Sequence, residues 1–87
     1  MIKKFDFSDK AQEDILYWKK IGDTKIQKKI QELLMSIQET PFSGIGKPEA
    51  LRHELSGSWS RKINQEHRVI YRVIDDTIKI ESLKGHY

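Results

Sequence analysis

The chain has 87 residues, enough for one domain with a single core, and its 37% hydrophobic and 33% charged residues suit a folded protein. It contains no cysteine, which excludes disulfides, thiolate zinc sites and cysteine nucleophiles. The formal net charge of +3 is compatible with a nucleic-acid partner but too small to indicate one. The histidines lie too far apart for the His pair of a zinc site, and no apolar stretch reaches the roughly eighteen residues of a membrane span. We therefore expect a cytoplasmic protein without a metal, a cofactor or a membrane contact.

The first half of the chain predicts a strand and two helices. Alternating phenylalanines predict a short strand over residues 2–7, and Ser8 or Asp9 can cap a helix over about 9–21. Asp23 can cap a second helix, which a Thr-Pro pair ends. Apolar residues recur in this second helix at helical spacing, at Ile26, Ile30, Leu33, Leu34 and Ile37.

The second half predicts a long loop followed by four strands. Residues 41–50 hold two glycines and two prolines, which indicates a loop. β-Branched and aromatic residues then predict strands over 51–55, 59–64, 68–74 and 77–83. The fold class that follows is α+β in one domain, residues 1–87. Its N-terminal strand and two-helix hairpin pack on one face of a mostly antiparallel, twisted sheet.

Three features are unusual for a purely structural domain. The long loop holds Lys47 and Glu49 and runs into Arg52, and loops of this length are often functional, although a solvated turn is the alternative. The chain closes with His86 and Tyr87, which are either a frayed tail or two stackable, titratable side chains beside the sheet.

The third feature is a group of basic residues on two neighbouring strands: Arg61, Lys62, Arg68 and Arg72. Lys62 and Arg68 flank a turn and are expected to face the same side, while Arg68 and Arg72 share a face with Ile70. A cationic sheet face suits phosphate, because a guanidinium binds it bidentately. The alternative is an ordinary solvated face. His53, by its alternation with leucines, and His67, in a turn, are predicted to be structural.

A carboxylate, guanidinium groups and a histidine together match the requirements of RNA cleavage without a metal. A base must take the 2′-hydroxyl proton, an acid must protonate the departing 5′-oxygen, and a fixed cation must offset charge on the phosphate. The composition permits this chemistry without singling it out.

Four motifs, in order, resemble the YoeB/Txe toxins of the RelE-like superfamily of bacterial toxin–antitoxin systems. They run from Thr40 to Glu49, from Leu51 to Arg61, from Glu66 to Tyr71, and over His86-Tyr87. The resemblance covers essentially the whole chain, including the Tyr-Trp pair of the first predicted helix. It implies a RelE-like, microbial RNase-like topology.

The resemblance also implies a function. Members of this family are ribosome-dependent endoribonucleases that enter the vacant A site, cleave the exposed mRNA codon and inhibit translation. A cognate antitoxin neutralises the toxin by wrapping it with its C-terminal segment. The family's general base corresponds to Glu49, its general acid to His86, its phosphate-stabilising arginine to Arg68, and its closing aromatic to Tyr87.

Further basic residues are expected at the RNA. Arg52 and Lys62 match positions where the family carries basic side chains facing RNA, and Lys47 and Arg61 join them in the predicted RNA- or phosphate-binding set. Glu66 lies in the third motif without an assigned role. Gly85 stands where relatives often have an aromatic residue, and we expect it to loosen the tail.

Two alternatives to an endoribonuclease remain at this stage. A non-catalytic ribosome- or RNA-binding module would inhibit translation by occupancy alone. A pure protein-interaction scaffold would leave the arginine-bearing strands unexplained. Whether the free chain forms a homodimer is left open by the sequence.

Overall fold

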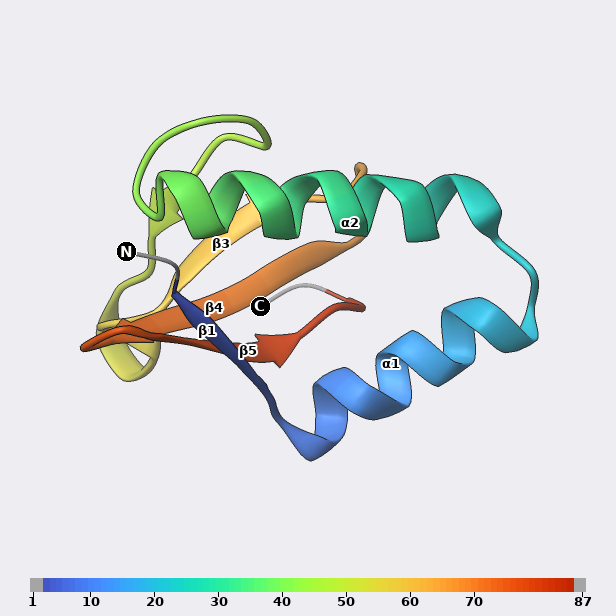
Figure 1. Ribbon diagram of the computed structural model, residues 1–87, viewed down its shortest axis with the longest axis horizontal. Helices are drawn as coiled ribbons and strands as arrows, with labels where there is room; N and C mark the ends of the chain where they lie inside the picture. Colours follow the sequence, from blue (N-terminus) through green and yellow to red (C-terminus); the bar gives the residue numbers. More distant parts are fainter. Residues whose placement is uncertain (1–2, 86–87) are drawn as a thin grey trace.

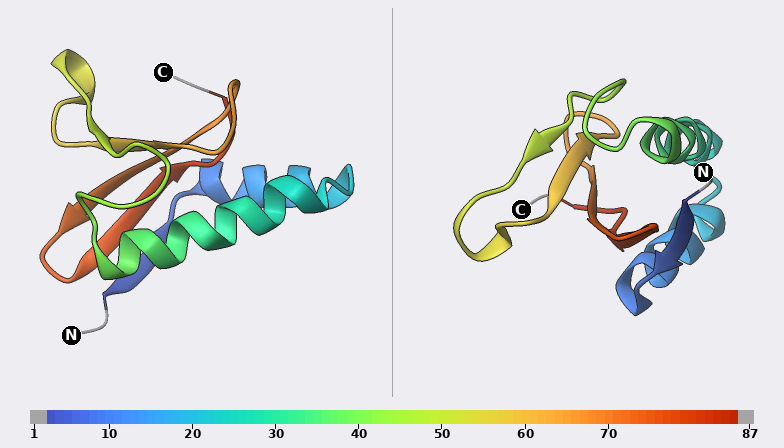
Figure 2. Two further views of the ribbon diagram at one scale, coloured as in Figure 1. Left: turned by 90° about the horizontal axis from the view of Figure 1, so that it is seen from above. Right: turned by 60° about the vertical axis from the view of Figure 1, so that its left-hand side comes forward.

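The computed structural model describes residues 3–85, which form two helices packed on a five-stranded sheet (Figure 1). The elements, in chain order, are β1 (Lys4–Phe7), α1 (Asp9–Lys20), α2 (Thr24–Glu39), β2 (Glu49–Ala50), the 3-10 helix η1 (His53–Leu55), β3 (Trp59–Lys62), β4 (Arg68–Ile74) and β5 (Thr77–Ser82). Strand order across the sheet is β1-β5-β4-β3-β2. The sheet lies between the helices and the projecting η1 turn (Figure 2, left). Within residues 3–85, no helix is long and apolar enough to cross a membrane.

The helices begin where the sequence supplies caps. The Ser8 hydroxyl accepts a hydrogen bond from the Ala11 N–H at 3.0 Å, and the Asp23 carboxylate accepts one from the Ile26 N–H, also at 3.0 Å. Each side chain satisfies an amide that the first helical turn leaves without a partner. The two predicted helices are therefore confirmed, and Ser8 rather than Asp9 caps the first.

The core lies between the apolar stripe of α2 and the inner face of β4 and β5. Trp18 and Ala11 close it from α1. Tyr71 and Val69 of β4 are fully buried, as are both isoleucines of β5. The buried residues of α2 are four of the five predicted from helical spacing: Ile26, Ile30, Leu33 and Ile37.

The sheet is antiparallel except at one edge, where β1 pairs with β5 in parallel. A bulge interrupts the β4–β5 pairing, because Ile70 and Tyr71 oppose Ser82 and Ile80 and leave Glu81 as an extra residue. The predicted architecture of a helical hairpin on a mostly antiparallel sheet is confirmed.

The predicted strand over residues 51–55 is wrong. Only Glu49 and Ala50 pair with β3, and the chain then turns through η1, where His53 has a φ of 58°. Local bonds take the place of the ladder, since the Ser56 N–H donates to the His53 carbonyl at 3.0 Å. The alternation of apolar residues did not reflect two strand faces, because Leu51 is buried whereas Leu55 is exposed.

Candidate active site

The candidate site lies on the sheet face opposite the helices. Glu49 stands opposite Ser60, Ser60 stands opposite Ile70, and two residues along the ladder Lys62 stands opposite Arg68. Residues directly opposite in an antiparallel pair project from the same face. The intervening residues of β3 and β4 point into the core, so these five side chains project from the outer face.

The register also sets the scale of the site. Glu49 and Arg68 are separated by two strand spacings and an offset of two residues, which corresponds to about 12 Å between their Cα atoms. Both side chains are long enough to extend over the shared face between them. A carboxylate and a pair of cations therefore flank Ser60 and Ile70, which are nearly inaccessible to solvent.

Arg68 is oriented by the turn that precedes β4. Its Nη1 donates to the carbonyl oxygens of Asn64 at 2.8 Å and His67 at 3.1 Å. The Asn64 side chain in turn accepts the N–H groups of Glu66 and His67, at 2.9 and 2.8 Å. The turn therefore holds one edge of the guanidinium, and no hydrogen bond joins Nε or Nη2 to any residue between 3 and 85.

The end of the described chain comes to the start of β4. The Arg68 N–H donates to the Gly85 carbonyl at 2.9 Å. His86 and Tyr87, the predicted acid and stacking aromatic, lie outside the described residues. Gly85 has a φ of 82°, a conformation that suits glycine, and both of its backbone polar groups are bonded. Gly85 itself is thus held at both backbone groups, whereas the expected loosening concerns the tail, which lies outside the described residues.

The other predicted RNA contacts occupy different surroundings. Lys47, with a φ of 52°, and Arg52 are exposed on either side of β2, and Lys62 is partly exposed beside Arg68. Arg52 and Glu49 both line a hollow of about 420 Å³ next to η1. Glu66 is exposed in the turn before Arg68.

Arg61 corrects the sequence-based assignment, because its side chain is 0% exposed. Nε donates to the Tyr71 hydroxyl at 3.2 Å, and Nη1 donates to the Ser36 hydroxyl at 2.6 Å. The remaining bonds go to carbonyl oxygens of the loop after α2: Ile45 at 3.1 Å, Thr40 at 2.6 Å and Ser43 at 2.8 Å. With all five N–H groups used inside the protein, Arg61 anchors the loop that leads to Glu49 and is not an RNA contact.

Tyr71 completes this anchor. Its hydroxyl donates to the Pro41 carbonyl at 2.5 Å. Burial raises the pKa of the Tyr71 phenol above its ordinary value, against the opposing effect of the hydrogen bond and charge of Arg61. The phenol therefore stays a neutral donor, and the loop is tied to both β3 and β4.

Sequence reasoning missed a polar network on the outer face and the side chains that hold the chain end. Arg72 Nη2 donates to the Ser58 hydroxyl at 3.2 Å, which donates to the Glu81 carboxylate at 2.6 Å. His67, which was expected to be structural, and Trp18 both contact the segment after β5. A buried indole N–H usually needs a hydrogen-bond acceptor, so the sequence could have indicated that Trp18 makes such a bond. It could not have indicated which acceptor Trp18 uses.

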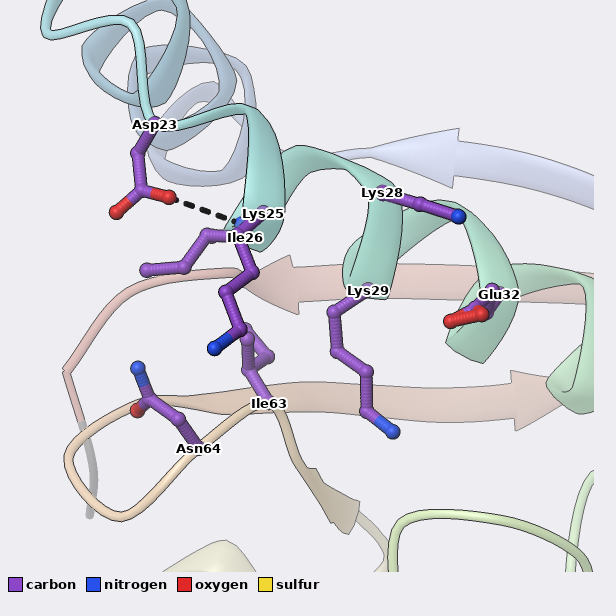
Figure 3. Close-up of a pocket in the computed structure, with 8 residues that line it drawn as sticks. All are labelled: Asp23, Lys25, Ile26, Lys28, Lys29, Glu32, Ile63 and Asn64. Carbon is purple, nitrogen blue, oxygen red and sulfur yellow. Dashed lines mark hydrogen bonds between the residues drawn. The ribbon is translucent and has the colours of Figure 1, made fainter.

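A second hollow, of about 560 Å³, lies away from these residues (Figure 3). It is between the start of α2 and the end of β3, where the Lys25 and Lys29 side chains extend toward Ile63 and Asn64. None of the predicted site residues lines it. Across residues 3–85, no three His, Cys, Asp or Glu side chains are grouped to hold a metal ion.

Known relatives identify the chain. The family model described as a YoeB-like toxin of a bacterial type II toxin-antitoxin system matches residues 7–87. Toxin YoeB of Escherichia coli (strain K12) is 48% identical over 84 residues, which cover 97% of this chain and 99% of that protein. The chain belongs to the YoeB-like toxin family. Toxin RelK of Mycobacterium tuberculosis is 45% identical over 86 residues, covering 99% of this chain and all of that one.

Solved structures agree with this membership. The YoeB dimer from Staphylococcus aureus superposes with a TM-score of 0.90 and 48% identity over the full length of both chains. YafQ from E. coli, at 18% identity and a TM-score of 0.73, shares the fold. The resemblance seen in the sequence is confirmed, and the chain is a YoeB-like toxin of a type II toxin–antitoxin system.

Proposed function

We propose that this YoeB-like toxin is a metal-independent endoribonuclease that cleaves mRNA in the ribosomal A site and so inhibits translation. The observation that carries the proposal is the register pairing of Lys62 with Arg68 on the same outer face as Glu49. It brings two partly exposed cations and an exposed carboxylate to one face of the sheet. These are the groups that a phosphodiester transfer needs, apart from its acid.

The reaction assigns one task to each residue. Glu49 accepts the proton of the 2′-hydroxyl, whose oxygen attacks the adjacent phosphorus. Arg68 offsets the charge that builds on the phosphate oxygens, assisted by Lys62. His86, the residue after Gly85, gives its proton to the departing 5′-oxygen, and Tyr87 stacks on or orients a base. The products are a 2′,3′-cyclic phosphate and a 5′-hydroxyl end.

The proposed substrate is mRNA presented by the ribosome. The cationic side chains of the outer face, Lys62 and Arg68, are partly exposed and recognise phosphate rather than base edges. Lys47 and Arg52, exposed at the edge strand, extend the positive surface toward the backbone of the bound RNA. A larger body that holds the codon in place supplies the orientation that a strip of sheet cannot provide alone.

Two protein partners are also proposed. The YoeB–YefM complexes from Staphylococcus aureus contain relatives at 46% and 48% identity that cover this whole chain. A relative of the same organism forms a YoeB dimer. By this similarity we propose a cognate antitoxin that neutralises the toxin, and a homodimer of the free toxin, in the cytoplasm.

A reconstituted translation reaction tests the activity. Purified toxin is added to ribosomes stalled with a vacant A site, and new mRNA 5′ ends are mapped by primer extension. Glu49→Gln and His86→Gln are each expected to lower the single-turnover cleavage rate by about 10²–10⁴-fold. Glu66→Gln, a change of the same chemistry in the exposed turn, serves as the matched control.

The outcomes separate catalysis from occupancy. Cuts within the A-site codon that vanish in Glu49→Gln and His86→Gln support the proposal. Inhibition of translation without any new 5′ end, unchanged in both variants, would show that the toxin acts by occupancy. The proposal is also overturned if chelation of divalent ions abolishes cleavage on ribosomes that remain intact.

A further inference from the structure

The segment after β5, residues Leu83–Gly85, is held by side chains from distant parts of the chain. The Leu83 N–H donates to the Asp14 carboxylate at 2.9 Å, and the Trp18 indole N–H donates to the Leu83 carbonyl at 3.0 Å. Asp14 and Trp18 are both nearly inaccessible to solvent. Helix α1 therefore fixes the chain as it leaves the sheet, where terminal segments ordinarily fray.

His67 fixes the next point along the chain. Its Nδ1 accepts the Gly85 N–H at 2.9 Å, and the neighbouring Arg68 N–H donates to the Gly85 carbonyl, also at 2.9 Å. Gly85 is thus bonded on both sides to two consecutive residues at the start of β4. This tether joins the residue before His86 directly to the residue that carries the proposed phosphate-binding guanidinium.

The His67 ring is itself held in place. It packs edge-on against Trp18, with ring centroids 4.8 Å apart and an interplanar angle of 77°. The backbone N–H of His67 donates to the Asn64 side chain at 2.8 Å, and the backbone carbonyl of His67 accepts the Ile63 N–H at 3.0 Å. In this arrangement Nδ1 is the ring nitrogen that acts as the hydrogen-bond acceptor.

We propose that His67 is a positioning residue of this toxin: by accepting the Gly85 N–H, it sets where the chain places residue 86 relative to Arg68. The inference rests on the proposed function. His67 touches no reacting atom, and it acts through Gly85 on the proposed acid. A shift of about 1 Å in such a group lowers a rate by about 10²-fold, so a single backbone tether has a measurable effect.

Two substitutions separate the hydrogen bond from the packing. His67→Phe keeps a ring against Trp18 but removes the acceptor. His67→Asn removes the ring but places a carbonyl oxygen near the position of Nδ1. We expect His67→Phe to lower the single-turnover cleavage rate by about 10²-fold at unchanged half-saturating ribosome concentration, and His67→Asn to restore most of that rate.

A measurement independent of cleavage accompanies the rates. Amide hydrogen exchange of Gly85, followed by NMR on the full toxin, is expected to speed up about tenfold in His67→Phe and to stay near wild type in His67→Asn. If His67→Phe does not fold, His67→Gln replaces it, because its amide lies nearer to the position of Nε2 than to that of Nδ1.

Each result decides the question. The inference is overturned if Gly85 exchange is the same in wild type and the variant without the acceptor. It is also overturned if His67→Asn cleaves as poorly as that variant, since the ring alone would then matter. If wild-type toxin makes no cuts, the proposed function fails, while the exchange experiment still tests the tether between His67 and Gly85.

Discussion

Replacing Arg61 is the sharpest test of how the loop before Glu49 is held. Arg61→Met keeps an unbranched apolar stem like that of arginine and removes all five hydrogen bonds of the guanidinium. We expect the free energy of unfolding to fall, although a buried charge is removed, because the acceptors inside the protein lose donors that no neighbouring residue replaces.

The size of the effect follows from the exposure of the acceptors. A net value of about 1 kcal/mol for each of five bonds gives about 5 kcal/mol. Thr40, Ser43 and Ile45 are exposed residues, so water can replace the guanidinium at their three carbonyls. The two remaining losses, at the Tyr71 and Ser36 hydroxyls, amount to about 2 kcal/mol, which for a domain of this size lowers Tm by about 8–16 °C.

Urea unfolding followed by tryptophan fluorescence measures this difference. Lys62→Met is the matched control, since it removes a cation from the next residue of the same strand on the outer face, and we expect it to change stability by about 0.5 kcal/mol or less. Arg61→Lys, with three donors on one nitrogen, is expected to lie between them. Equal stability of Arg61→Met and Lys62→Met would show that the hydrogen bonds of Arg61 do not stabilise the fold.

Three further predictions concern stability. The folded-state pKa of Tyr71 is raised, so the stabilisation by this group is complete below pH about 10 and is lost as pH rises through the folded value. Wild type should therefore lose stability above pH about 10 more steeply than Tyr71→Phe. Parallel curves of the free energy of unfolding against pH would contradict this. Gly46→Ala should cost about 1–2 kcal/mol of backbone strain, and more because its Cβ would lie only 2.6 Å from the Leu33 side chain. Gly22→Ala, whose Cβ would have nothing within 4 Å, should show the strain alone. Thermal unfolding compares the two variants, and equal losses of stability would be inconsistent with the contact to Leu33. Asp23→Ala should lower the free energy of unfolding by about 1 kcal/mol in urea, Asp23→Asn should retain most of it, and no difference between the two would argue against the cap.

Much of the fold could be predicted because it depends on local chemistry. The caps at Ser8 and Asp23 and the apolar spacing of α2 identified both helices within a residue or two. Alternation identified β3, β4 and β5, and the turn between Lys62 and Arg68 predicted that these two would face the same side, as their register confirms.

The errors have a physical cause as well. Arg61 was assigned to the cationic face by its charge, although its alternation with Trp59 and Ile63 placed it on the inner one. The Arg61 side chain can be buried despite its charge, because loop carbonyls and hydroxyls accept the hydrogen bonds of the guanidinium. The tether of Gly85 could not be predicted, since its partners His67 and Arg68 are 18 and 17 residues away along the chain and no local pattern links them.

The parallel pairing of β1 with β5 determines when the sheet can be completed as the chain is synthesised. Lys4 pairs with Thr77, so the first strand has no partner until β5 has been made. β5 pairs with β4 across a short hairpin, whereas contacts of long sequence separation, such as those of β1 with β5, form late in folding. A nascent chain that ends before residue 77, or a product truncated there, leaves both β1 and β4 without β5 as a neighbour. The sheet is therefore incomplete until nearly all of the described chain has been translated.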